Sequence, residues 1–152
     1  MAEISSRHAA KIAAGTKILP TESTGKKRVL IVGTPTTHAL GNGDTIASGV
    51  PLPVGTRFLS GSLVSNAALG ALVTLDVGIR DFKTKVAIDA DGIAAAVAVA
   101  TAGRSALNNG DLVKDGAEYV TSVVSEVYLT IGGAAPTANT QLRVEVEYVA
   151  ID

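Results

Sequence analysis

The clearest pattern in the sequence is a strict alternation of apolar and polar residues in two segments. In residues 72–80, Val, Leu and Ile at the odd-numbered positions alternate with Thr, Asp, Gly and Arg. In residues 142–148, Leu, Val and Tyr at the even-numbered positions alternate with Arg and Glu. Because successive side chains of a strand point to opposite faces, both segments are predicted to be half-buried strands, the second with a charged outer face.

Three further segments predict strands. Residues 27–32 (KRVLIV) are rich in β-branched residues and are followed by Gly33, and residues 119–131 form a longer apolar run. Residues 43–59 hold strand material interrupted by prolines, which favour sheet edges and corners. Turns are predicted at the two Asn-Gly pairs, which end at residues 43 and 110.

The Ala-rich segment of residues 92–103 is ambiguous. Its alanines favour a helix, whereas the spacing of Val97 and Val99 favours a strand. We expect a loop with a short helical or strand piece. The preceding Asp89–Gly92 (DADG) is similar to part of a calcium-binding loop but lacks the first and last ligands of such a loop, so it is predicted to be a turn.

The number and spacing of these segments define the fold class. Six or seven short strands separated by Gly, Pro and Asn turns, without alternating long helices, predict an all-β protein, an antiparallel β-sandwich or jelly roll over residues 27–152. Residues 1–26 are predicted to be an extended N-terminal arm and linker. Within this arm, residues 5–15 could form a short helix with Ser5 as its cap and Gly15 at its end.

Composition narrows the chemistry. The chain has 152 residues, of which 47 % are hydrophobic and 18 % charged, enough for one globular domain. Aromatic residues make up 3 %, so the core is predicted to consist of Val, Ile, Leu and Ala. With no cysteine, disulfides, thiolate metal sites and thiol nucleophiles are excluded. No run approaches the roughly 18 apolar residues of a membrane span, and we expect neither a membrane association nor an export signal.

The charge is distributed unevenly. Residues 1–28 carry six cations and two acids, a net charge of +4, whereas the remaining residues carry a net charge of −5. Such an arm is either solvated or orders on a partner surface. Because +4 is modest and the acidic body would repel phosphates, we expect no direct binding of nucleic acid. The cations of the arm are the candidate binding residues: Arg7, Lys11, Lys17, Lys26, Lys27 and Arg28.

The usual catalytic arrangements are missing from the sequence. His8 and His38 have no partner at metal-binding spacing and are predicted to be surface residues. There is no phosphate-binding loop and no G-x-S-x-G elbow. Glu145 and Glu147 lie on the same face of one strand, whereas a glycosidase pair must face across a cleft. We therefore expect no enzyme, no cofactor and no metal.

One long segment resembles a known group of proteins. Residues 61–103 contain a T-L-D-V-G strand at residues 74–78, an acidic turn at Asp81, an I-D dipeptide at residues 88–89 and an Ala-rich stretch at residues 94–100. This order is similar to that in small virion proteins of tailed bacteriophages, and the closing LRVEVEYVAID is similar to the terminal strand of such chains.

The resemblance implies a role among these virion proteins. It is strongest to capsid decoration (cement) proteins, which have a jelly-roll body, are often trimeric, and are tied to the outer shell by an N-terminal segment. It therefore implies the major capsid (coat) protein as partner, a homotrimer, and a location on the outer capsid surface of the virion after synthesis in the host cytoplasm. The long basic arm departs from the family and aligns with none of its motifs.

Other roles stay open at this point. The alternative within the virion is a tail or head-fibre component whose sandwich binds a host-surface glycan, although the scarcity of aromatic residues argues against stacking on sugars. A small hydrolase on a β-sandwich and a self-assembling scaffold outside phages are the other classes that the composition permits.

Overall fold

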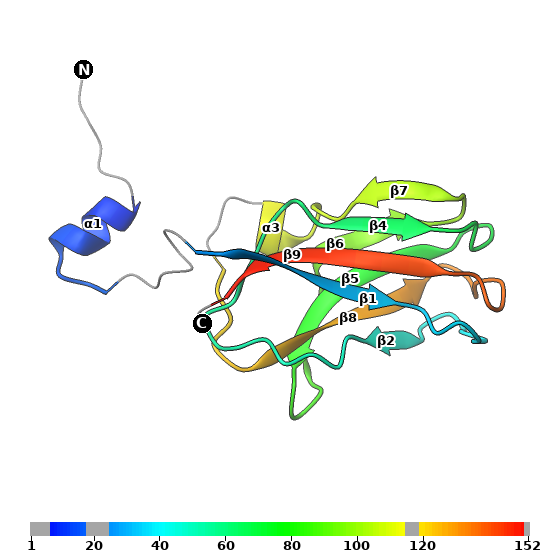
Figure 1. The fold of residues 1–152 in the computed structure, drawn as a ribbon, viewed down its shortest axis with the longest axis horizontal. Coiled ribbons are helices and arrows are strands. Elements are labelled where there is room, and N and C mark those ends of the chain that lie inside the picture. Colours follow the sequence, from blue (N-terminus) through cyan, green and yellow to red (C-terminus); the bar gives the residue numbers. More distant parts are fainter. Residues whose placement is uncertain (1–6, 18–24, 115–118, 151–152) are drawn as a thin grey trace, which may run out of the picture.

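The described residues form a sandwich of two antiparallel sheets (Figure 1). The computed structural model describes residues 7–17, 25–114 and 119–150. The order of strands in the first sheet is β1 (Lys27–Gly33), β9 (Leu142–Val149), β4 (Leu63–Asn66) and β7 (Gly103–Ala106), with β3 (Arg57–Phe58) also paired to β9. The order in the second sheet is β2 (Thr45–Ala47), β8 (Ser125–Gly132), β5 (Thr74–Asp81) and β6 (Ala87–Ala98).

The chain passes repeatedly between the two sheets. β1, β4, β7 and β9 belong to one sheet, whereas β2, β5, β6 and β8 belong to the other, and every described pairing is antiparallel. With the two-residue β3 set aside, the strand orders 1-9-4-7 and 2-8-5-6 are those of a jelly roll. The predicted all-β sandwich is confirmed.

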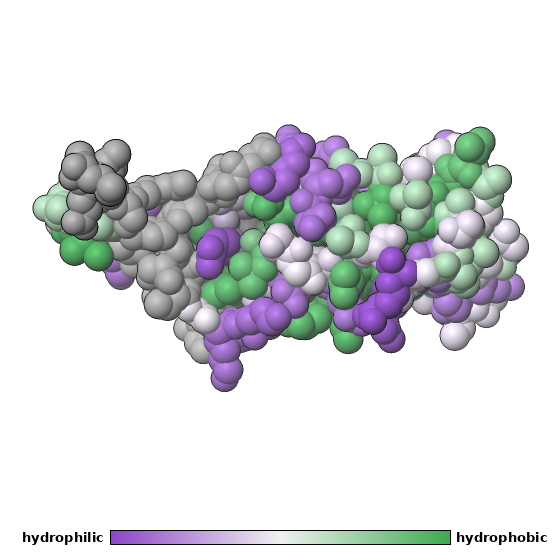
Figure 2. Space-filling view, turned by 90° about the horizontal axis from the view of Figure 1, so that it is seen from above, coloured by the Kyte–Doolittle hydropathy of each residue, from purple (hydrophilic) through white to green (hydrophobic). Residues whose placement is uncertain are grey.

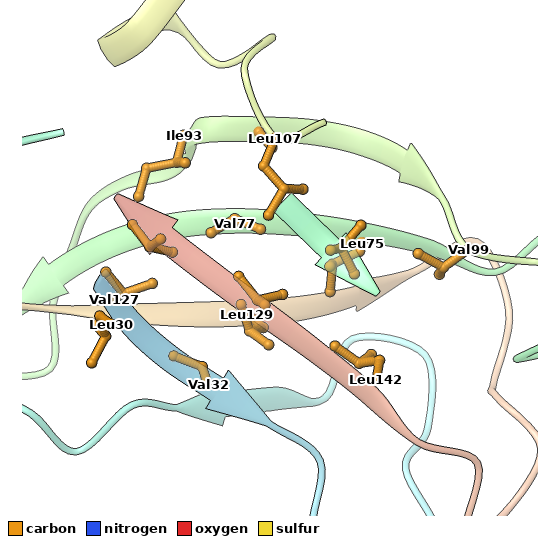
Figure 3. Packing of buried hydrophobic residues seen from close by; sticks show 14 of the residues in the cluster. Leu30, Val32, Leu75, Val77, Ile93, Val99, Leu107, Val127, Leu129 and Leu142 are labelled. Carbon is orange, nitrogen blue, oxygen red and sulfur yellow. The ribbon is translucent and has the colours of Figure 1, made fainter. Parts of the chain in front are cut away.

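The core fills the space between the sheets. In β5, Leu75, Val77 and Ile79 have no exposed surface, as their alternation predicts, and the inward residues of β9 are likewise buried. The buried cluster consists of Leu, Val, Ile and Ala with Phe58 as its one aromatic member among the described residues, which confirms the predicted core composition. In Figure 3 these aliphatic side chains converge from both sheets.

Within the described residues, two short helices lie outside the sheets. α1 (Arg7–Ala13) belongs to the arm, and α3 (Asp111–Lys114) follows the predicted Asn-Gly turn. Gly15, two residues after the last residue of α1, has a φ of +70°. The N–H of Gly15 donates to the carbonyl of Ile12, and the N–H of Thr16 donates to that of Lys11, which is the Schellman ending that glycine favours. The predicted cap, Ser5, lies outside the described residues.

The structure corrects two predictions about β6. The Ala-rich segment belongs largely to this strand, because residues 94–98 pair along β5 and bury Ala94, so tertiary pairing overrides the helix preference of alanine. Asp89–Gly92 does not end a strand as a turn. These residues form a bulge inside β6, where the register shifts and Gly78 alone stands opposite residues 90–93.

The predicted strand over residues 119–131 begins later, at Ser125. Residues 119–124 are held by a loop instead of a neighbouring strand. The N–H of Thr121 donates to the carbonyl of Thr56 at 2.9 Å, and the carbonyl of Thr121 accepts from Gly55 at 2.7 Å. The backbone of this segment therefore bonds the loop at Gly55 and Thr56 and does not extend β8.

Candidate interaction surfaces

The cations predicted for the arm fall into two groups, separated by residues 18–24, which lie outside the description. In the first group, Lys11 lies on α1 and Lys17 is exposed four residues after its end. The backbone of Arg7 begins α1, and its side chain lies outside the described part. These three positions lie within eleven residues of one another in the sequence.

The second group begins the sandwich. Lys26, Lys27 and Arg28 are consecutive and exposed where the chain enters β1. The Nζ of Lys27 lies 2.7 Å from Oε1 of Glu147 on β9. The carboxylate of Glu147 thus partly neutralises the charge of Lys27, so Lys27 adds less positive charge to the surface than its position in the sequence predicts.

α1 also carries apolar surface. Ile12 is 67 % exposed, and Ala9, Ala10 and Ala13 are exposed beside it. Figure 1 shows α1 apart from the sandwich, beyond the end at which β1 begins. An isolated helix of this length is only marginally stable in water, and the sandwich does not cover these side chains.

A second exposed apolar surface lies on β1. Leu30 and Val32 point into the core, whereas Val29 and Ile31 point outward and are 51 % and 62 % exposed. The sequence predicted the strand but gave no face or position in the sheet. One feature of the sequence indicated an exposed apolar face: residues 29–32 are all apolar, whereas a half-buried strand ordinarily alternates apolar and polar residues.

A third apolar surface surrounds the β5–β6 hairpin. Val86 is exposed on the hairpin, and the nearby Phe82 N–H donates to the carbonyl of Val124 at 3.0 Å. Val123 and Val124 are exposed just before β8, and Val54 is exposed on the loop that runs beside them. The apolar character of this end therefore comes from loops as well as from the hairpin.

The same hairpin is held by a buried ionic cluster that the sequence did not reveal. Glu126 of β8 has no exposed surface. Its Oε1 accepts from Nε of Arg80 and from Nζ of Lys85, each at 2.7 Å. The guanidinium of Arg80 lies 5.1 Å from the ring centre of Tyr128. A glutamate within the apolar run VVSEVYLTI was the available signal.

The cluster keeps Glu126 ionised. Burial by itself raises the pKa of this carboxyl, but the hydrogen bonds from Lys85 and Arg80 outweigh the burial, and the net pKa lies below the ordinary value. Oε2 of Glu126 has no hydrogen-bond partner among the described atoms. The arrangement therefore joins the hairpin to β8.

The acidic residues of the bulge do not gather into a metal site. The Oδ1 of Asp89 accepts from the N–H of Asp91 at 3.2 Å. Burial raises the pKa of Asp89 and outweighs this hydrogen bond from the Asp91 N–H, which lowers it. Across residues 7–17, 25–114 and 119–150, no three His, Asp or Glu side chains lie close enough to hold a metal ion.

The histidines are likewise apart. The side chain of His8 lies outside the description. His38 is half-buried instead of lying on the surface as predicted. Its ring Nε2 lies 2.6 Å from the carbonyl oxygen of Thr140, and its backbone N–H donates to Oδ1 of Asn139. It ties two loops together at one end of the sandwich.

The remaining surface is mixed. Figure 2, seen from the β7 side, shows hydrophilic and hydrophobic residues intermingled along the sandwich. Within the described part of the chain, no helix has the length and apolar character needed to cross a membrane. Exposed large apolar residues lie on α1, on the outer face of β1 and at the end that carries the hairpin.

Comparison with known proteins identifies this fold in two solved structures. No family model matches the sequence, and no curated protein matches it. The chain is similar to a chain in the capsid of Ralstonia phage GP4, with a TM-score of 0.65 and 16 % identity over 90 % of this chain and 92 % of that one. It is also similar to a chain in the capsid asymmetric unit of cyanophage Pam1, with a TM-score of 0.59 and 22 % identity over 84 % and 86 %.

The shared feature is the fold. In each case the similarity extends over most of both chains. At these identities it carries no residue roles from one chain to another.

Proposed function

We propose that this protein is a capsid decoration (cement) protein of a tailed bacteriophage, which binds the outer surface of the coat lattice and stabilises the mature head. The observation that carries the proposal is the fold similarity to chains of two phage capsids over at least 84 % of this chain. The sequence resemblance to small virion proteins points to the same setting independently.

In this proposal, the arm is the part that grips the coat protein. α1 is short, carries cations, and exposes Ile12 together with its alanines. A complementary coat surface would be acidic and would have an apolar groove for this helix. Ordering the arm on that surface costs conformational entropy, but it lets a short segment reach across a wide area.

The body acts as a rigid spacer. Its core is closed between the two sheets, and the Glu126 cluster fixes the hairpin to β8. A cement protein needs no reaction, because bridging neighbouring coat subunits already raises the free energy needed to separate them against the outward pressure of packed DNA. We therefore propose a structural role without enzymatic activity.

We further propose that three copies act together. Each arm alone would bind weakly, since its net charge is only +4. Joining three bodies raises the effective concentration of the second and third arms once the first has bound. The spacing of the arms would then select a lattice of matching spacing, such as the expanded shell over the immature one.

Removal of the arm tests this function. Capsids of the encoding phage, stripped of the protein, are mixed with the full chain or with a variant that lacks residues 1–26, and are pelleted. We expect the full chain to co-sediment and the truncated body, with an unchanged β-type circular dichroism spectrum, to stay in the supernatant. Equal pelleting of the two proteins would contradict the role of the arm.

A further inference from the structure

β1 is an open edge of its sheet. Among the described strands it pairs with β9 alone, and it stands at the end of the order β1-β9-β4-β7. It is seven residues long. An edge strand presents unpaired N–H and C=O groups, and proteins ordinarily protect such edges with charges, prolines, bulges or short strands. The middle of β1, Val29 to Val32, contains none of these features.

The free backbone groups belong to the residues whose side chains point outward. The N–H of Thr34 donates to the carbonyl of Leu142 on the β9 side at 3.1 Å. Because hydrogen bonding alternates along an antiparallel strand, even-numbered residues of β1 bond β9, and odd-numbered residues direct their N–H and C=O groups to the free edge. Val29 and Ile31 are therefore open both at the backbone and at the side chain.

We propose that β1 pairs with β1 of a second copy of this chain, antiparallel and about a two-fold axis at Leu30. This contact concerns the sandwich alone and does not rest on the proposed function. In this register Val29 faces Ile31 of the second copy, and Ile31 faces Val29 of the second copy. The odd-numbered residues of both strands then satisfy one another's free N–H and C=O groups.

The self-complementarity of β1 favours a second copy over an unrelated strand. Shifting the axis to Val29 would place Lys27 opposite Ile31, and shifting it to Ile31 would place Val29 opposite Gly33. With the axis at Leu30, both exposed apolar residues face apolar residues. Lys27 then faces Gly33 at the far end, and its charge is already paired with Glu147.

Pairing in this register also separates the arms. The two β1 strands run in opposite directions, so the arms leave from opposite ends of the joined sheet. The first and last residues of β1 are six steps of about 3.3 Å apart, so these ends are separated by roughly 20 Å. In the proposed trimer, a two-fold β1 contact would join copies that belong to adjacent trimers. The arms of the two joined copies would then contact different points of the coat lattice.

Cysteine trapping tests the contact, because the chain contains no cysteine of its own. V29C and I31C are prepared separately in the full-length protein, oxidised either alone or as an equal mixture, and run on a non-reducing denaturing gel. Facing Cα atoms at about 5.5 Å suit a disulfide, whereas the diagonal pairs in each single variant, about 7 to 8 Å apart, do not. We expect at least fivefold more dimer from the mixture than from either variant alone.

The opposite edge provides a matched control. β7 pairs with β4 alone among the described strands, and Arg104 and Ala106 are exposed at the same spacing. A mixture of R104C and A106C should give no enrichment. Equal yields from the mixture and the single variants at β1, or equal yields at β1 and β7, would overturn the proposal. Cross-linking of β1 to coat subunits in particles without any dimer in solution would also overturn it.

Discussion

The carboxylate of Glu126 accepts the Nε–H of Arg80 at 2.7 Å although the glutamate side chain has no exposed surface. Arg80 and Glu126 also stand directly opposite each other in the β5–β8 register. Two residues that face each other across the β5–β8 ladder thus also form an ion pair through their side chains. Lys85, which reaches the same oxygen from the hairpin, extends this link beyond the sheet.

We predict that Glu126→Gln lowers the free energy of unfolding by about 2 kcal/mol, because it removes the buried carboxylate that accepts from the partly buried Arg80 and the half-exposed Lys85. Urea unfolding at pH 7 measures this loss. The matched control is Glu145→Gln, which breaks an exposed pair with Arg143 and should cost less than about 1 kcal/mol. Equal losses in the two variants would contradict a stabilising role for the buried cluster.

The same cluster predicts a pH dependence. The pKa of Glu126 is lower in the folded chain than in the unfolded one, because the hydrogen bonds outweigh burial. Its contribution to stability is therefore complete above the unfolded pKa, about 4.3, and is lost as the pH falls through the folded pKa. We expect the stability advantage of the wild type over Glu126→Gln to hold at pH 5–7 and to shrink below about pH 4. An advantage that grows with acidification would reverse the assigned direction.

We predict that Gly78→Ala strongly destabilises the body. A Cβ at this position would collide with the backbone carbonyls of Asp89 and Ala90 in the bulge of β6. Overpacking of this kind costs about 1–3 kcal/mol or more, which thermal unfolding would detect. Gly103→Ala is the control, because a Cβ there meets nothing within 4 Å. A Gly78→Ala variant as stable as Gly103→Ala would show that the bulge does not need the glycine.

We predict that charge reversal in the arm weakens capsid binding. The double variant Lys17→Glu and Lys26→Glu changes the net charge of residues 1–28 from +4 to 0, and we expect at least a tenfold loss of co-sedimentation at low salt. Lys83→Glu with Arg104→Glu makes the same change on the body and should bind as the wild type does. Binding of the wild type should fall as salt rises. Equal losses in both double variants would indicate a general charge effect.

The elements that the sequence predicted well are those whose own pattern decides their structure. β5 and β9 alternate with period two because one face is buried, and β1 is short, β-branched and ends in glycine. The jelly roll could be inferred from their number and spacing. Segments whose structure depends on distant partners were predicted poorly, as the Ala-rich part of β6 shows, because pairing with β5 determines its conformation.

The candidate surfaces were only partly predictable. Lys27 looks like one more charge of the arm until β9 places Glu147 beside it. The Glu126 cluster joins residues 80, 85 and 126, and only the pairing of β5 with β8 brings them together. The exposed Val29 and Ile31 follow from the position of β1 at a sheet edge, which a single sequence does not specify.

Cryo-electron microscopy of the purified phage particle tests the central claim most directly. The account predicts several hundred copies of this chain on the outer surface of the head, each with residues 1–26 ordered against coat subunits and the sandwich projecting outward. A handful of copies at the tail or on head fibres would favour the alternative role. A density in which the arm folds back on its own sheet and touches no coat subunit would contradict the account.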